Sequence, residues 1–215
     1  MSDPHPIPLS GRRAQAAAND SVILEAARVV FTADPGAPIS AVARQAGVGI
    51  SALYRRYPGK EDLLRTLARD GLQRFIDELE AALADDRDPW TAFADFMRRA
   101  VDANTSSLTR ALAGTFTPTP EMWASGQRAA ELLGELFART RAAGALRPGL
   151  DVHDLSLIFE QLAAVRAGDA ERTRQLRHRY LALILEAMHQ PGGDPLPGPA
   201  PAWAEINERW AARDG

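Results

Sequence analysis

Basic, hydroxyl and aromatic side chains gather between positions 38 and 64, where apolar residues recur at short intervals. The first of these apolar groups has helical spacing and consists of Ile39, Val42, Ala43 and Ala46. Gly47 follows it, and glycine is the residue that most readily ends a helix in the left-handed conformation. Basic side chains beside small polar ones suit the binding of phosphate oxygens and of base edges.

A second helix is expected from about Gly49 to Tyr57, before Pro58 and Gly59 interrupt it. Leu53 and Tyr57 fall on its buried side. The residues expected on its outer side are small or basic: Ser51, Ala52, Arg55 and Arg56. A basic surface of small side chains fits the major groove, so the segment predicts a helix-turn-helix whose second helix meets DNA.

The order of these residues resembles the tetracycline-repressor (TetR) family of bacterial transcription regulators. The matching residues are Val42-Ala43, Ala46-Gly47-Val48, Leu53-Tyr54, Tyr57-Pro58, Lys60-Glu61 and Leu64. The resemblance covers roughly residues 17 to 64, because a preceding helix with apolar residues at helical spacing also belongs to it. Beyond residue 64 the chain is similar to the family only in style, as a helical ligand-binding and dimerisation domain.

The resemblance implies DNA contacts at particular positions. It assigns phosphate contacts to Tyr54 and Lys60. Ser51, Ala52 and Arg55 are expected near base edges, and Arg56 near the end of the helix. Ser40 is expected either to face the DNA or to cap its helix. Two residues at the start of the second helix depart from the family pattern. Gly49 stands where serine or threonine is common, and Ala52 replaces a threonine, so a hydroxyl group is lost while a methyl group can still pack on a thymine.

Lys60 is the only lysine among 25 lysine and arginine residues. A lysine at this position fits a phosphate contact, since a compact ammonium acts as a point charge. The alternative is a solvated lysine in a turn.

Residues 12 to 60 hold seven basic and three acidic side chains, whereas residues 61 to 215 hold 18 basic and 24 acidic ones. This asymmetry suits a protein that touches DNA through one end.

Composition argues against other classes. The chain lacks cysteine, and its four histidines are scattered, so the sequence offers no thiolate chemistry, no metal-ligand motif and no catalytic grouping. We therefore expect no enzyme activity, no metal and no cofactor. Apolar runs stay well short of the ~20 residues of a membrane span. The expected protein is cytoplasmic and has no membrane partner.

These residues must be positioned by helices, and the expected fold is all-α with about nine of them. Past the helix-turn-helix, helices are expected at about 61–84, 89–103, 106–113, 120–143, 152–167 and 170–189, with a short terminal helix at 202–213. The predicted organisation is a flexible arm at 1–16, a DNA-binding domain at 17–64, an effector-binding and dimerisation domain at 65–190, and a proline- and glycine-rich tail at 191–215.

Aromatic and methionine residues of the middle helices are candidates for an apolar effector pocket. They are Trp90, Phe93, Met97, Met122, Trp123 and Phe137. The alternative is an ordinary hydrophobic core. By resemblance a pocket is expected, because family members commonly release DNA when a small molecule binds between these helices.

The last two long helices are apolar over a broad arc, and one face cannot bury them all. We expect the surplus to form a homodimer interface, as in the resembled family. The interface candidates are Leu155, Ile158, Phe159, Leu162, Tyr180, Ile184 and Met188.

The sequence thus predicts a TetR-like regulator of transcription, most simply a repressor, which binds a palindromic double-stranded operator as a homodimer and leaves it when a small apolar effector binds. The competing hypothesis is a DNA-binding protein that is architectural and effector-independent, or that is controlled by a partner protein.

Overall fold

The computed structural model describes residues 9–34, 36–103, 116, 118–189, 192–194 and 196–207, with side chains from Asp20 to Ile206. These residues form nine helices and no strands, which confirms the all-α fold. The helices are α1 (Leu9–Ala33), α2 (Ile39–Ala46), α3 (Ile50–Arg56), α4 (Lys60–Leu83), α5 (Pro89–Asp102), α7 (Pro120–Ala142), α8 (Asp154–Ala164), α9 (Ala170–Met188) and α10 (Trp203–Asn207). The helix expected at 106–113 lies outside the described residues.

Two compact units make up the chain, Met1–Leu67 and Ala68–Gly215, so the division falls within α4. In the first unit, α2 packs on α1 and on α3. Gly47 ends α2 with a φ of 66°, and its N–H lies 3.2 Å from the carbonyl oxygen of Arg44. Gly49 is the N-cap of α3. The two glycines therefore define the turn of the helix-turn-helix, as the sequence predicts.

The first helix is longer than the sequence analysis predicts. It begins at Leu9, whereas a flexible arm was expected up to residue 16. The segment includes four alanines between positions 14 and 18, and alanine has the highest helix propensity of all residues. This local preference outweighs the single glycine at position 11. Residues 1–8 of the expected arm lie outside the described part of the chain.

Two helices of the second unit begin at residues whose side chains cap the first turn. Asp88 accepts a hydrogen bond from the Thr91 N–H at 3.0 Å and caps α5, whose first residue is Pro89. Thr119 caps α7 in the same way, through the Met122 N–H at 3.3 Å. These signals explain why the expected bounds of both helices agree with the structure to within a residue.

Helix α8 is shorter than expected, and both ends have a local cause. Residue 152 was expected to begin it, but the Asp151 carboxylate accepts the His153 N–H at 3.0 Å and holds a turn before the helix. At the other end, the buried Arg177 of α9 donates to the carbonyl oxygens of Ala163 and Val165 at 3.0 and 3.2 Å. Its guanidinium satisfies carbonyls that a longer helix would have bonded.

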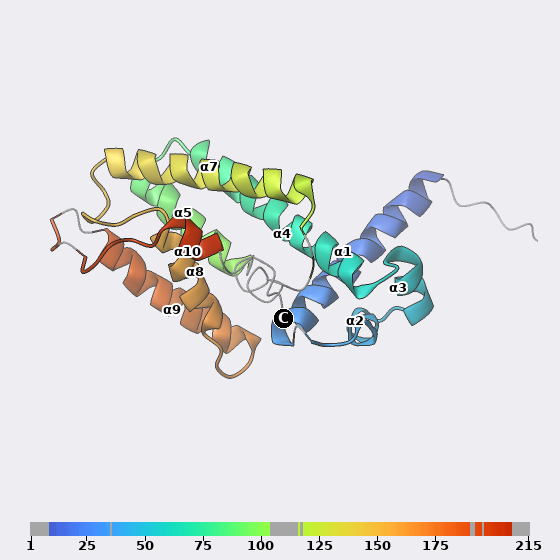
Figure 1. Ribbon diagram of the computed structural model, residues 1–215. Helices are drawn as coiled ribbons and strands as arrows, with labels where there is room; N and C mark the ends of the chain where they lie inside the picture. The colour runs from blue at the N-terminus through green and yellow to red at the C-terminus, as the bar shows by residue number, and fades with distance from the viewer. Residues whose placement is uncertain are drawn as a thin grey trace, which may run out of the picture. The chain divides into compact units, whose positions relative to one another are not determined.

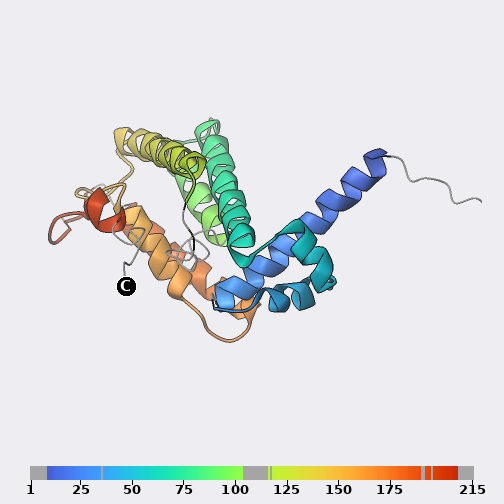
Figure 2. The same ribbon diagram turned by 45° about the vertical axis from the view of Figure 1, so that its right-hand side comes forward.

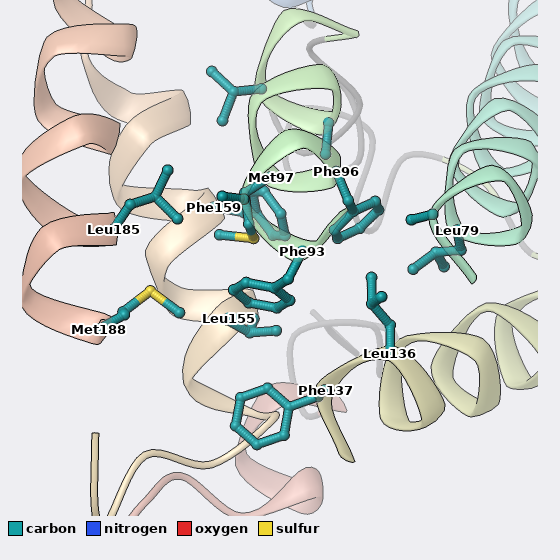
Figure 3. Packing of buried hydrophobic residues seen from close by; sticks show 14 of the residues in the cluster. Leu79, Phe93, Phe96, Met97, Leu136, Phe137, Leu155, Phe159, Leu185 and Met188 are labelled. Carbon is teal, nitrogen blue, oxygen red and sulfur yellow. The ribbon is translucent and has the colours of Figure 1, made fainter. Parts of the chain in front are cut away.

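The core of the second unit is built around α5, which packs against α7, α8 and α9. Figure 3 shows Phe93 and Met97 of α5 in the middle of this core, with Leu136 from α7 and Phe159 from α8 around them. Phe96 lies on the side of α4 and meets Phe75 at 5.6 Å between ring centroids. Ridges of large apolar side chains thus hold the four helices to α5.

Helix α10 lies beside α8 in both views of the chain (Figures 1 and 2), and the Trp203 ring lies 5.8 Å from that of His153. Ile206 is buried, whereas Trp203 remains half exposed. Residues 208–213 of the expected terminal helix lie outside the described residues. None of the helices in the described ranges is both long and apolar enough to cross a membrane.

Candidate nucleic-acid interface

The orientation of α3 is set by two buried side chains. Leu53 is fully buried and Tyr57 nearly so, as the spacing predicted. Helix α3 packs on α2, and the buried apolar residues of the first unit include Val42 of α2 and Phe31 of α1. Because Leu53 and Tyr57 face inward, solvent reaches the remaining circumference of α3.

Four residues of α3 share this exposed side: Ile50, Ser51, Tyr54 and Arg55. Successive residues of a helix are rotated by about 100°, so these four occupy one continuous arc. Ala52 is half-buried at the edge of this arc, and Arg56 leaves the helix from roughly its opposite side. The structure therefore brings together three of the residues predicted for α3 and separates the other two from them.

Arg56 has a partner within its own unit. Its Nε donates to both carboxylate oxygens of Asp20 in α1, at 2.6 and 2.9 Å, and its Nη2 donates to the same carboxylate. The Tyr57 hydroxyl lies 3.5 Å from Asp20, and the Arg56 guanidinium lies 5.6 Å from the Tyr57 ring centroid. Hydrogen bonding to Asp20 raises the pKa of Arg56. The charge of Arg56 is thereby largely balanced without DNA.

Lys60 is the first residue of α4 rather than part of a turn. Its Nζ lies 5.2 Å from the centroid of the buried Phe31 ring, a cation–π geometry that orients the side chain. Ser40 is exposed on the first turn of α2. Since Pro38 is the N-cap of that helix, Ser40 is its second residue and not its cap.

Sequence reasoning missed two residues of this region. Ile50 was not assigned to the exposed side of α3, although its spacing of four residues from Tyr54 predicts a shared side. Asp20 was counted only as an acidic charge. Its contact with Arg56 joins positions 36 residues apart, and short-range patterns carry no signal for such a pair.

Candidate pocket residues divide into two groups. Phe93, Met97 and Phe137 are buried together, and the rings of Phe93 and Phe137 lie 6.4 Å apart. Trp90 packs against this cluster, 5.9 Å from Phe93. Trp123 is 51% exposed, so it is a surface side chain. Met122, its neighbour at the start of α7, is half-buried.

The candidate dimer residues also divide. Four of them are buried within their own subunit and cannot face a partner: Leu155, Phe159, Leu162 and Met188. Ile158 and Ile184 are half-buried at the margin of the core. Tyr180 is 48% exposed, and its neighbour Leu183 is 56% exposed. Of these two helices, α9 therefore has the larger exposed apolar surface, because most apolar residues of α8 are buried in the core.

Short helices α2 and α3, a glycine turn between them and an exposed basic side on α3 define a helix-turn-helix DNA-binding protein. Comparison with known proteins identifies its family. A family model described as "Bacterial regulatory proteins, tetR family" matches residues 23–67. A second, described as "Transcriptional regulator SbtR-like, C-terminal domain", matches residues 88–190.

Individual relatives agree. The HTH-type transcriptional repressor LfrR of Mycolicibacterium smegmatis is 38% identical over 82 residues, which span 38% of this chain and 41% of LfrR. A TetR transcription regulatory protein from Mycobacterium vanbaalenii has a similar structure, with a TM-score of 0.56 and 29% identity over 83% of this chain and 99% of that one. The structure of LfrR in complex with proflavine has a TM-score of 0.58 at 23% identity, covering 76% of this chain and 95% of that one.

The chain belongs to the TetR family of transcriptional regulators. The resemblance inferred from the sequence is thus confirmed. Since the family and the relatives are regulators of transcription, the protein acts by binding DNA and not as an enzyme.

Proposed function

We propose that this protein is a cytoplasmic, homodimeric repressor that binds a palindromic operator and leaves it when a small apolar effector binds. The observation that carries the proposal is the exposed arc of α3. It combines a hydroxyl, a phenol and a guanidinium from Ser51, Tyr54 and Arg55 on a helix short enough to enter a major groove. Lys60 follows at the start of α4 and supplies a phosphate contact.

A dimer would present two such helices. We expect half-sites separated by about one helical turn of DNA, ~34–36 Å, or a simple multiple of it. The test is selection of bound duplexes from a random pool with the full chain, followed by sequencing. An enriched inverted repeat is the expected result. Recovery of sequences no different from the starting pool would overturn the proposal of specific binding.

Support for the dimer comes from α9. Tyr180 and Leu183 are large, mostly apolar side chains that the subunit leaves exposed, and Ile184 lies beside them half-buried. Exposed apolar side chains that adjoin one another favour an interface over plain solvent. A two-fold axis would bring the same helix of each subunit together.

Support for an effector comes from the core around α5. Its side chains are aromatic or thioether groups at Trp90, Phe93 and Met97, which suit an apolar ring system. Arg99 of α5 binds Glu78 of α4 at 2.5 Å, so a ligand that displaced α5 would also act on α4. Helix α4 includes residues of both units and is the covalent route toward α3. Because LfrR is described with proflavine, this planar dye is a reasonable first probe.

A second candidate function is regulation without a small molecule, by architecture or by a partner protein. The packing of Phe93 against Phe137 favours regulation without a small molecule, because the two buried side chains occupy space that an effector would need. Binding measurements across a metabolite and dye collection separate the two. A compound that binds the protein and releases the selected operator supports the effector, whereas the absence of any such compound supports the second candidate.

A further inference from the structure

An aliphatic side chain stands exposed at the start of the recognition helix. Ile50 is the first residue of α3 and is 40% exposed. It precedes Tyr54 by one helical turn, so both lie on the arc that also carries Ser51 and Arg55. Ile50 is therefore part of the surface that this fold turns toward DNA.

The turn before Ile50 is open. Apart from its neighbours in the chain, a Cβ atom added at Gly47 or at Gly49 would meet no atom within 4 Å. The residues after Ile50 are the small Ser51 and Ala52. Ile50 is thus the bulkiest side chain at this end of α3, and its neighbours would not prevent a close approach to base edges.

The exposed part of Ile50 contributes nothing to the stability of the fold, whereas covering it with an apolar group would be favourable. In the major groove, the apolar group on the base edges is the C5 methyl group of thymine. Basic and hydroxyl side chains would bind the other edge atoms, which are hydrogen-bond donors and acceptors. The chemistry of Ile50 matches thymine and none of the other three bases.

We propose that Ile50 is a specificity residue that packs against the methyl group of one thymine in each half-site. The inference rests on the proposed operator binding and names one base of that operator. The two residues of α3 would then recognise different base atoms: Ile50 a methyl group, and Arg55 the acceptor atoms of a guanine. The sequence-based expectation had given the methyl contact to Ala52, which the structure places at the edge of the arc.

The test removes the methyl group from the DNA. In the selected operator, each thymine is replaced in turn by deoxyuridine, which keeps every hydrogen-bonding atom and lacks only the C5 methyl. One thymine per half-site should be sensitive. Burial of a methylene-sized group contributes ~0.8 kcal/mol, so replacing the sensitive thymine of one half-site should weaken binding about fourfold. Replacing it in both half-sites should weaken binding about 15-fold.

The protein variant Ile50→Ala then identifies the partner. It should bind thymine and deoxyuridine operators equally at the sensitive position, and alanine is well tolerated in a helix. Val29→Ala is the matched control, since Val29 is an exposed β-branched residue of α1 in the same unit. This control should keep the full fourfold preference for thymine. Circular dichroism of both variants verifies that they are folded.

Three results would overturn the inference. They are an operator without thymine in its half-sites, equal affinity for every deoxyuridine operator, and an Ile50→Ala protein that still prefers thymine. The last result would mean that Ile50 covers sugar or phosphate groups instead. All three require a selected operator, so they differ from failure of the proposed function, in which selection enriches no sequence at all.

Discussion

Asp20 of α1 and Arg56 of α3 form a two-point contact in which one Arg56 nitrogen lies 2.6 and 2.9 Å from the two Asp20 carboxylate oxygens. The Arg56 side chain is 60% exposed, so water screens the pair and its contribution to folding is small, ~0.2–1 kcal/mol. Its geometric effect is larger. A planar guanidinium held at two points restrains the end of α3 against α1.

We therefore predict that Arg56 orients α3 and does not bind phosphate. Arg56→Gln and Asp20→Asn should each weaken binding to all duplexes by a similar, several-fold factor. The double variant should be no worse than either single one, because both changes remove the same contact. Binding isotherms at several salt concentrations supply the check. A salt slope that falls by about 1.8 in Arg56→Gln would instead indicate a phosphate contact in each subunit of a dimer.

Lys60 should behave in the opposite way. Lys60→Ala removes one phosphate contact per subunit, so the salt slope of a dimer should fall by about 1.8. The same change removes the cation–π contact with Phe31 and should cost ~0.5–1 kcal/mol of unfolding free energy. Lys60→Arg is the control, because it keeps the charge and should keep the slope. An unaltered slope in Lys60→Ala would exclude the contact.

The sequence predicts those parts of the fold that depend on local signals. The Gly47 turn and the starts of α5 and α7 each depend on signals within a few residues, and the sequence predicts each of them correctly. Helix α8 was misjudged because its end depends on Arg177, twelve residues beyond Val165. Such a contact exists only after the two helices have packed.

The proposed dimer surface illustrates a second limit. Helix α8 and the second half of α9 are apolar over a broad arc, so periodicity alone does not say which side faces the core. The structure turns Leu155 and Phe159 inward and leaves Tyr180 and Leu183 outside. Ile50 differs from these residues, because its spacing of four residues from Tyr54 already predicts its side of α3.

Substitutions on α9 should separate the subunits without unfolding them. Leu183→Arg places a charge in the proposed interface, where an unpaired buried charge costs ~3–5 kcal/mol, so the dimer should dissociate at micromolar concentrations. Phe159→Arg buries the charge within the subunit and should instead abolish folding. Light scattering combined with circular dichroism distinguishes these effects. A Leu183→Arg protein that is folded and fully dimeric would show that the interface lies elsewhere.

Acid should loosen the start of α5. Hydrogen bonds from Arg87 lower the pKa of Asp85 to about 2, and the interaction with Thr91 lowers that of the capping Asp88. A carboxylate whose pKa is depressed by folding stabilises the protein above its unfolded pKa of ~3.9. This stabilisation is lost as the pH falls toward about 2 for Asp85.

Thermal melting between pH 6 and about 2 tests this expectation. Asp88→Ala should lower the melting temperature at every pH, because it removes the cap together with the charge. Asp88→Asn should keep the cap and show a weaker dependence on pH. Equal pH dependence in the wild type and in Asp88→Asn would show that Asp88 ionisation does not stabilise the fold.

Trp90 should report the binding of an effector, because it packs on the core of the second unit and stacks on His189 with 4.2 Å between ring centroids. Trp123, the other tryptophan among the pocket candidates, is 51% exposed to solvent. A ligand near Phe93 should therefore change the fluorescence of the wild type and of Trp123→Phe, and the change should be lost in Trp90→Phe. The opposite pattern would move the site to the start of α7.

Methionine substitutions then locate the site, and linkage tests its role. Met97→Leu conserves volume in the core and should weaken the ligand, while Met122→Leu, on the first turn of α7, should leave its affinity unchanged. If ligand binding releases the operator, the operator must lower the affinity for the ligand by the same factor, about 5–150-fold for a coupling of ~1–3 kcal/mol. Titrations of proflavine, and of any compound that raises the melting temperature, with and without operator measure this factor. A ligand whose affinity is the same in both titrations would bind without regulating, which would leave control by architecture or by a partner protein.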